Sequence, residues 1–220
     1  QGGYSRWKFL SQAANTGRQI QSKYLYNIYQ GTAIVESAVT CGMSAIRDSE
    51  RDVMRLNSYG LGLDIARVLE VRRPRRLVIG VGGTATSDMF LGAAKALGFK
   101  FLGSDYSEID AIPENFLGIS RIVKPSLPML SGVEICVAAD VRNPLCGPDG
   151  ASAVFSPQKG ASPDQALFLD AALRHIASVI KRDLGADVMS MPGAGAGGGM
   201  AAGIAGLLGG SIISGAGFVL

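Results

Sequence analysis

Two apolar runs rich in β-branched residues constrain the fold most, because each leads directly into a glycine-rich polar loop. The runs cover residues 77–81 and 133–139. Continuous apolar runs of this length are typical of strands buried on both faces of a parallel sheet. Helical patterns follow both loops, so strands alternate with helices along the chain. We therefore predict an α/β fold with a mixed, partly parallel sheet and flanking helices.

A capping signal marks the longest predicted helix. Ser162 is followed by Pro163 and, three residues on, by Gln165, which is a capping box with proline at the first helical position. Apolar residues then recur at helical spacing, at Leu169, Leu173, Ile176 and Ile180. We predict a helix from Pro163 to about Leu184. Shorter helices are predicted over residues 61–70, 88–97 and 200–208.

The remaining segments give weaker patterns. Residues 32–39 predict a strand that turns into a helix, and short strands are predicted at 99–102, near 119–123 and within 211–220. Residues 140–161 read as a polar loop between a buried strand and a helix. Residues 1–30 mix polar and aromatic side chains without a clean period, so strand and irregular structure stay open there.

Composition limits the classes of protein that this chain can belong to. With 220 residues, 47% of them apolar, it can bury a sizeable core. A net charge of +3 is too small to indicate a nucleic-acid partner, and the basic run 72–76 lacks interleaved aromatic residues. The chain has three cysteines and no CxxC pair, which predicts reduced thiols and a cytoplasmic location. A single histidine argues against a metal site, and no apolar leader is present at the N-terminus.

The last 33 residues, from Val188 onward, carry no charge and raise the question of a membrane or self-assembly role. Small residues at GxxxG spacing could form a helix-dimer face there. Against a membrane span, Gly209 and Gly210 interrupt the apolar residues and no Lys or Arg flanks the segment. We therefore predict no membrane partner.

The first glycine-rich loop permits two functional interpretations. Gly80, Gly82 and Ala85 fit the G-x-G-x-x-A form of the dinucleotide fingerprint, and Asp105 lies near the offset of its ribose-binding acid. A dinucleotide-binding module without kinase activity is therefore an alternative function. Hydroxyl and acidic side chains from residues 84–88 also suit phosphate or sugar hydroxyls. The structural interpretation is a tight turn with Ser87 or Asp88 as N-cap.

The second and third loops carry other groups that suit an anion. Asp140 follows a strand directly, where it could bind Mg²⁺, orient a hydroxyl, or cap the turn at Asn143. Lys159 precedes a capped helix and could hold a phosphate as a point charge. Residues 193–198 could form a nest of backbone N–H groups or simply allow close packing. No Walker A motif is present, and His175 is interpreted as structural.

Taken together, these loops resemble the bacterial glycerate kinase family of the GarK/GlxK type. The resemblance rests on IGVGGTATSD at 79–88, DVRNPLCGPDGASAVFSPQKGAS at 140–162 and PGAGAGGG at 192–199. The family's patterns are similar to IGxGGSATND, DVxNPLxGxxGAxxxFxPQKGA and PGAGAxGG. The segments TAIVESAVTCGMSAI at 32–46 and NSYGLG at 57–62 also look like family segments, so order and spacing agree over roughly 32–220.

The resemblance implies ATP-dependent phosphorylation of D-glycerate with Mg²⁺, at a cleft between two domains. Residues 1–220 look like the family's inserted second domain, without the Rossmann-like domain that flanks it. The chain is then one lobe of the site, inactive by itself if the flanking domain is absent, and its oligomeric state stays open. By resemblance, the catalytic residues are Asp88, Asp140 and Lys159. The expected substrate- or nucleotide-binding residues are Gly82, Gly83, Thr84, Thr86, Asn143, Gly193, Gly195 and Gly197.

Three departures from the family patterns bear on these expectations. Ser87 stands where the family has Asn, and Leu61 replaces the Thr of YGTG. Met89 and Phe90 stand where the family usually has two glycines, so bulky side chains could narrow the site. Whether the 2- or the 3-hydroxyl of glycerate accepts the phosphate, and which group is the general base, stay open at this point.

Overall fold

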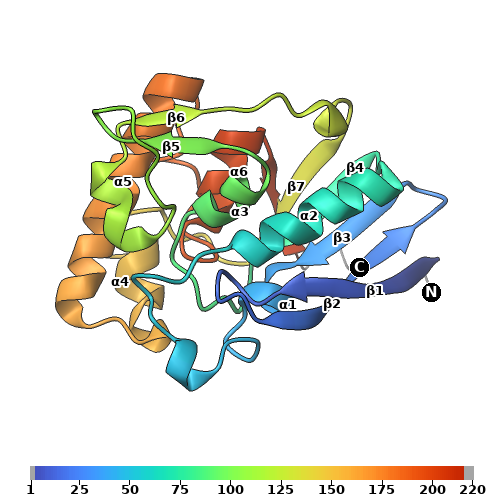
Figure 1. The fold of residues 1–220 in the computed structure, drawn as a ribbon, viewed down its shortest axis with the longest axis horizontal. Coiled ribbons are helices and arrows are strands. Elements are labelled where there is room, and N and C mark those ends of the chain that lie inside the picture. Colours follow the sequence, from blue (N-terminus) through green and yellow to red (C-terminus); the bar gives the residue numbers. More distant parts are fainter. Residues whose placement is uncertain (1–2, 216–220) are drawn as a thin grey trace.

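A computed structural model describes residues 3–215 of the chain, and within them a six-stranded sheet forms the backbone of the fold (Figure 1). Its strand order is β1-β2-β3-β4-β7-β8. The strands are β1 (Tyr4–Gln12), β2 (Gln19–Asn27), β3 (Thr32–Glu36), β4 (Arg76–Gly80), β7 (Glu134–Ala138) and β8 (Ser211–Ile213). The first three pair antiparallel, whereas β3, β4, β7 and β8 run parallel. A separate antiparallel pair joins β5 (Lys100–Leu102) to β6 (Arg121–Val123). The predicted mixed, partly parallel sheet is confirmed.

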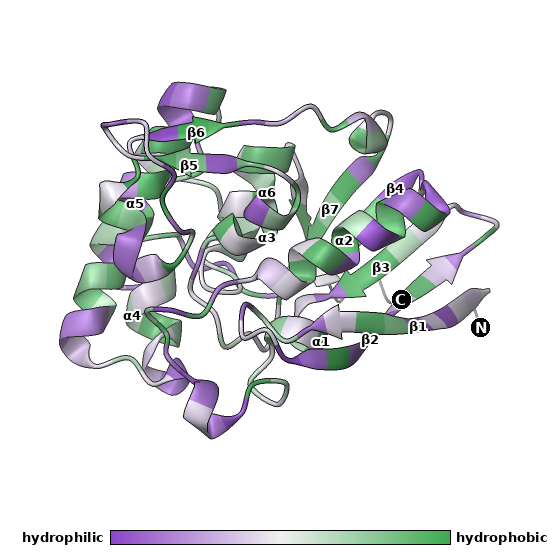
Figure 2. Cartoon of the chain, in the orientation of Figure 1, coloured by the Kyte–Doolittle hydropathy of each residue, from purple (hydrophilic) through white to green (hydrophobic). Residues whose placement is uncertain are grey.

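Helices connect the parallel strands. They are α1 (Ser37–Cys41), α2 (Tyr59–Arg72), α3 (Leu91–Ala96), α4 (Ala151–Phe155), α5 (Pro163–Leu184) and α6 (Met200–Leu208). Short 3-10 turns occur at Asp48–Glu50, Pro113–Gly118, Pro128–Leu130 and Pro157–Lys159. Helix α2 contacts β1 and β3 and packs on α3, while α5 packs on α6 away from the sheet (Figure 1). Hydrophobic residues run through β7 and α6 at the centre of the molecule (Figure 2).

The local signals at α5 and α6 predict these helices correctly. In α5, the Ser162 hydroxyl accepts from the Gln165 N–H at 3.2 Å, and the Gln165 side chain accepts from the Ser162 N–H at 2.9 Å. Gly185 ends the helix in a left-handed conformation, as glycine does at this position.

None of the helices in residues 3–215 has both the length and the hydropathy that a membrane span needs. Of the strands predicted within 211–220, β8 is present, and residues 216–220 lie outside the described part.

Residues 4–27 form a regular hairpin, a segment whose structure the sequence left open. Tyr4 pairs with Asn27 at one end and Gln12 with Gln19 at the other. Tertiary contacts hold this hairpin against α2. The Arg72 guanidinium lies 3.8 Å from the centroid of the Trp7 ring, and its Nε donates to the Tyr24 hydroxyl at 2.7 Å. No pattern within residues 1–30 could have indicated a partner on α2.

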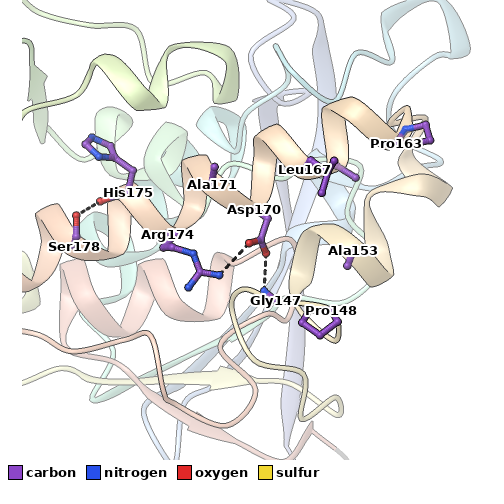
Figure 3. Close-up of a pocket in the computed structure, with 11 residues that line it drawn as sticks. Gly147, Pro148, Ala153, Pro163, Leu167, Asp170, Ala171, Arg174, His175 and Ser178 are labelled. Atoms are coloured by element: carbon purple, nitrogen blue, oxygen red, sulfur yellow. Dashed lines mark hydrogen bonds and ion pairs between the residues drawn. The ribbon is translucent and has the colours of Figure 1, made fainter.

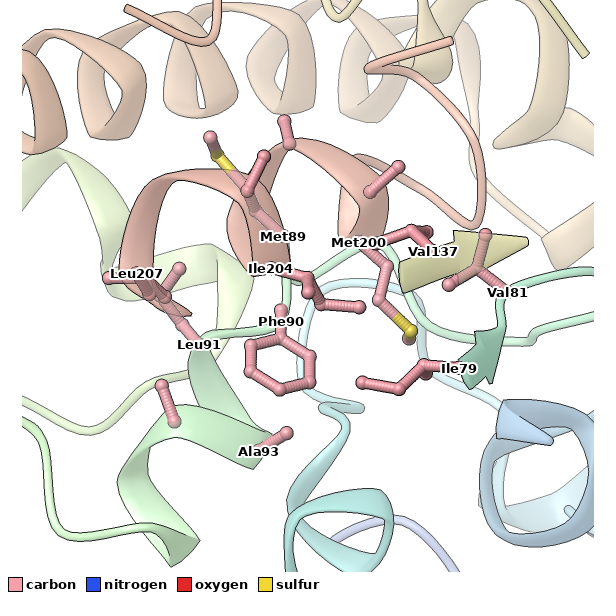
Figure 4. Close-up of a cluster of buried hydrophobic side chains, with 14 of the residues drawn as sticks. Ile79, Val81, Met89, Phe90, Leu91, Ala93, Val137, Met200, Ile204 and Leu207 are labelled. Atoms are coloured by element: carbon pink, nitrogen blue, oxygen red, sulfur yellow. The ribbon is translucent and has the colours of Figure 1, made fainter. Parts of the chain in front are cut away.

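Two segments differ from the sequence-based prediction. Residues 140–161, predicted as a loop, contain α4 and the 3-10 turn Pro157–Lys159. Helix α3 begins at Leu91, three residues later than predicted, because Met89 and Phe90 both take left-handed conformations, with φ of 49° and 67°. Their side chains are fully buried and pack with Met200 and Ile204 behind the strand ends (Figure 4). Left-handed backbone at these two residues is incompatible with an α-helix. Helix α3 therefore begins only after both side chains have entered the core.

Candidate functional site

The parallel strands bring the three glycine-rich loops to one edge of the sheet. Gly80 at the end of β4 pairs with Ala138 at the end of β7, so the loops that follow both strands start side by side. Such carboxyl edges are where open α/β sheets bind ligands. A cavity of about 440 Å³ lies there. Its lining includes Val81, Gly82, Gly83, Thr84, Asp140, Gln158, Lys159, Gly197 and Gly198.

Lys159 is the most unusual group in this cavity. Its side chain lines the cavity although the residue is only 5% exposed. The ammonium Nζ donates to the Thr86 carbonyl oxygen at 2.5 Å and lies 3.5 Å from the hydroxyls of Thr84 and Ser87. No carboxylate among residues 3–215 forms an ion pair with it. Burial lowers the pKa of Lys159 to about 8, although the charge of the nearby Asp88 opposes this shift. A buried cation that meets only neutral oxygens suits an anionic ligand.

The first loop exposes backbone to the same cavity. Gly82 has open space where a Cβ would be, and Gly83 has a φ of 68°. Hydrogen bonds from Met43 N–H to the Gly83 oxygen, 3.2 Å, and from Ala85 N–H to the Cys41 oxygen, 2.7 Å, anchor the loop to the end of α1. Thr84 lines the cavity, whereas Thr86 is buried below it and contributes its carbonyl to Lys159. A ligand can therefore approach the main chain at Gly82 and Gly83.

Asp88 is fully buried and does not line the cavity. Its Oδ2 accepts from the Ser58 N–H at 2.8 Å, the Ser58 hydroxyl at 2.7 Å and the Gly92 N–H at 3.0 Å. Burial raises the pKa of the Asp88 carboxyl, although these three donors oppose the shift. The arrangement ties the first loop to the starts of α2 and α3. Ser58, in the NSYGLG segment, is the partner that sequence reasoning did not identify.

The second and third loops pack on each other through glycine. The Gly193 N–H donates to the Arg142 oxygen at 3.3 Å and the Gly195 N–H to the Asn143 oxygen at 3.0 Å. A Cβ on Gly195 would lie 2.3 Å from the Pro144 oxygen. Gly193, Gly195 and Asn143 therefore shape the loops from outside the cavity, and the Asn143 amide donates to the Asp149 oxygen at 2.8 Å. Asp140 and Gly197 line the cavity itself.

Gly198 lines the cavity but was not among the predicted site residues. Its φ is 72°, and a Cβ there would lie 2.5 Å from the Thr86 oxygen and 2.8 Å from Lys159 Nζ. Its carbonyl accepts from the Met89 N–H at 3.3 Å. Glycine is required here because the third loop passes directly over the lysine. Met43, Phe155 and Gln158 are further lining residues that sequence reasoning missed. Of these, only Met43 lies outside the three loop motifs that carry the family resemblance.

A larger hollow, about 820 Å³, runs along α5 and α4 (Figure 3). Its wall is mostly apolar, and its polar groups already have partners. Asp170 accepts from the Gly147 N–H at 2.7 Å and pairs with Arg174 at 3.1 Å. His175 Nε2 lies 2.7 Å from the Ile119 oxygen, in agreement with its structural interpretation. None of the predicted site residues lines this hollow, so the smaller cavity at the strand ends is the better candidate site.

The dinucleotide alternative is not supported by the geometry around residues 80–85. That fingerprint requires a helix directly after the loop, with its N-terminal N–H groups open to a pyrophosphate. Helix α3 instead starts at Leu91, and its first residues are buried. Asp105 hydrogen-bonds Ser107 at an exposed turn and does not line the cavity.

Comparisons with known proteins agree with this geometry. The model of the glycerate kinase family matches residues 4–220. The chain is 41% identical over 174 residues to a glycerate kinase of Haemophilus influenzae, covering 79% of this chain and 46% of that protein. It is 40% identical over 185 residues to the glycerate 2-kinase of Escherichia coli, covering 84% and 48%.

A crystal structure assigned to glycerate kinase 2 of Salmonella typhimurium superposes with a TM-score of 0.93 at 32% identity, covering 99% of this chain and 58% of that one. The chain thus spans about half the length of the curated relatives that it matches. The family match over nearly the whole sequence shows that the chain belongs to the glycerate kinase family.

Proposed function

We propose that the protein phosphorylates D-glycerate with ATP, and that this chain supplies one side of the active site. The observation that carries the proposal is the buried Lys159, whose hydrogen-bond partners are all neutral oxygens, inside a cavity built by three glycine-rich loops. Phosphoryl transfer depends mainly on positioning and charge neutralisation, which such a cavity provides. The names of the relatives give the substrate, and the E. coli relative's name favours the 2-hydroxyl as the acceptor.

The residues divide into those that meet the ligand and those that position them. Lys159, the Thr84 hydroxyl and the main chain at Gly82, Gly83 and Gly197 bind the phosphoryl group. In the reaction, a glycerate hydroxyl oxygen bonds to the γ-phosphorus, the bond from that phosphorus to the bridging oxygen breaks, and the hydroxyl proton is released. Asp88, predicted as catalytic, is better proposed as a positioning residue because its carboxylate holds Ser58 and Gly92. Gly193, Gly195 and Asn143 shape the loops, and Thr86 orients Lys159.

Asp140 is the residue proposed to hold Mg²⁺. Mg²⁺ usually binds through one or two carboxylates, with substrate phosphates and water completing its shell. Asp140 is the carboxylate that lines the cavity, so the donors fit a metal shared with a nucleotide. Residues 3–215 contain no group of three or more His, Cys, Asp or Glu side chains that would bind a metal alone. Bound Mg²⁺ would neutralise charge on the transferred phosphoryl group.

We also propose the wider setting of this site. The chain spans about half of its relatives, which supports the interpretation that residues 1–220 form one domain and that a Rossmann-like domain closes the cavity. The reduced-cysteine composition supports a cytoplasmic location.

The test is ADP formation with ATP–Mg²⁺ in the presence and absence of D-glycerate, for the chain and for the full-length protein that contains it. We expect glycerate-dependent ADP formation from the full-length protein, and we expect Lys159→Met to reduce it by about 100-fold or more. The product is identified as 2- or 3-phosphoglycerate by ¹³C NMR. ADP formation that ignores glycerate, or that survives Lys159→Met, would refute the proposal.

A further inference from the structure

A second cationic hollow lies beside the candidate site, on the face of the sheet formed by the β1–β2 hairpin. Its volume is about 530 Å³. Three cations line it, Arg6 and Lys8 from β1 and Lys23 from β2, together with the single carboxylate of Glu36. All three cations are exposed, and none of them forms an ion pair with another residue in the described range 3–215. The hollow is therefore positively charged and open to solvent.

The sheet register concentrates this charge. Lys8 lies directly opposite Lys23 in the antiparallel pair, and Arg6 follows on the same face two residues away. Like charges that face each other across two strands destabilise the pairing. A bound anion would reduce the electrostatic repulsion between these two facing lysines. Gln21 and Ser44, which also line the hollow, add neutral hydrogen-bond donors.

The same register connects this hollow to the candidate site. Val35 pairs with Tyr24, so Glu36 lies in line with Lys23, and Glu36 in turn pairs with Gly80. Residues 38–45 form a common wall, because Ala38, Val39, Ser44 and Ala45 line the hollow while Met43 lines the cavity. A Cβ on Gly83 would lie 3.8 Å from the Ala38 side chain. The hollow and the cavity therefore adjoin at this segment.

We infer that this hollow, defined by Arg6, Lys8 and Lys23, is a second phosphate subsite that binds the non-transferred phosphates of the nucleotide. The inference rests on the proposed function, in which the Lys159 cavity takes the phosphoryl group that is transferred. The two subsites then share one triphosphate across the wall of residues 38–45. A carboxylate such as glycerate, with a single charge, would gain little from three cations, whereas a polyphosphate matches them.

The test is binding of inorganic phosphates to the 220-residue chain, which does not depend on turnover. Tripolyphosphate and orthophosphate are titrated by calorimetry and ³¹P NMR. The proteins are the wild type, Lys159→Met, Lys8→Gln/Lys23→Gln and the control Lys100→Gln/Lys124→Gln, whose lysines are exposed on the β5–β6 side. We expect Lys8→Gln/Lys23→Gln to weaken tripolyphosphate about tenfold. The same variant should keep its affinity for orthophosphate within about twofold of the wild type. The control variant should keep its affinity for both ligands within about twofold. Added salt should reduce the difference in tripolyphosphate affinity between Lys8→Gln/Lys23→Gln and the wild type.

The outcomes separate the two proposals. Equal tripolyphosphate affinity in the wild type and in Lys8→Gln/Lys23→Gln overturns the second subsite but leaves the proposed function standing. Unchanged orthophosphate affinity in Lys159→Met contradicts the proposed function instead. Equal weakening by the control pair would show that only net charge matters, which also overturns the subsite. Circular dichroism of each variant tests whether it keeps the secondary structure of the wild type.

Discussion

Lys159 and Asp64 are both buried ionisable side chains, but only Lys159 lies where a ligand can reach it. This difference shows what distinguishes a binding site from a structural charge. Lys159 lines a cavity, whereas Asp64 of α2 lies under the β1–β2 hairpin, is 1% exposed, and lines neither that cavity nor the hollow at the hairpin. Burial lowers the pKa of Lys159 to about 8 and raises the pKa of Asp64 to about 6. The Ser22 hydroxyl donates to Asp64 Oδ2 at 2.5 Å. A shifted pKa alone therefore does not identify a functional site; access for a ligand does.

The largest effect is expected from removing the two charges one at a time. Lys159→Met should weaken orthophosphate binding and reduce kinase activity by about 100-fold or more, because the cavity loses its cation. Asp64→Asn should leave both within about twofold, since no ligand reaches that position. Binding is measured by ³¹P NMR and turnover by ADP release. A comparable loss in both variants would show that the comparison reflects folding rather than ligand access.

The parts of the fold that sequence reasoning predicted depend on local signals, and the parts that it missed depend on distant contacts. The capping box at Ser162 and Gln165 lies within four residues, so α5 is predictable. The contact from Lys159 to Thr86 spans 73 residues, and the one from Ser58 to Asp88 spans 30. Lys159 could be proposed from its motif, but its burial and the role of Gly198 could not, because both arise only when the loops converge.

The second effect concerns how closely the third loop covers Lys159. Gly198→Ala should destabilise the protein by roughly 2–4 kcal/mol, because φ is positive and the new Cβ would meet the Thr86 oxygen and the lysine. Gly209→Ala is the matched control: its φ is 75°, and no atom lies within 4 Å of the place that a Cβ would take. It should cost only about 1 kcal/mol. Urea denaturation measures both, and equal costs would contradict a tight fit over Lys159.

The third effect is a pair of opposite pH dependences. Lys159 has a folded-state pKa of about 8, below its unfolded value, so the unfolded chain binds more protons above pH 8. Stability of the wild type relative to Lys159→Met should therefore rise between about pH 8 and 10. Asp64 has a folded pKa of about 6, above its unfolded value. Wild-type stability relative to Asp64→Asn should therefore fall between about pH 4 and 6.

Each of these pH differences should amount to about 2–3 kcal/mol, since one pKa unit corresponds to about 1.4 kcal/mol. They are measured by denaturant unfolding of each pair across pH 4–10. Orthophosphate should counteract the Lys159 trend, because a bound anion favours the charged lysine, and should leave the Asp64 trend unchanged. If the stability difference changes with pH in the same direction for the Lys159→Met and the Asp64→Asn comparisons, general charge repulsion rather than these two groups sets the pH dependence.

The smallest expected effect tests whether the backbone at Met89, beside the loop that covers Lys159, is strained. Met89 has a φ of 49°, and its N–H donates to the carbonyl of Gly198, which lies over Lys159. Both Met89→Ala and Met89→Gly remove the buried side chain, but only glycine relieves the left-handed conformation. Met89→Gly should therefore be about 1 kcal/mol more stable than Met89→Ala in urea denaturation, the reverse of the order in an ordinary helix. The order seen in an ordinary helix would mean that the turn at Met89 is unstrained and that the third loop is held over Lys159 by packing alone.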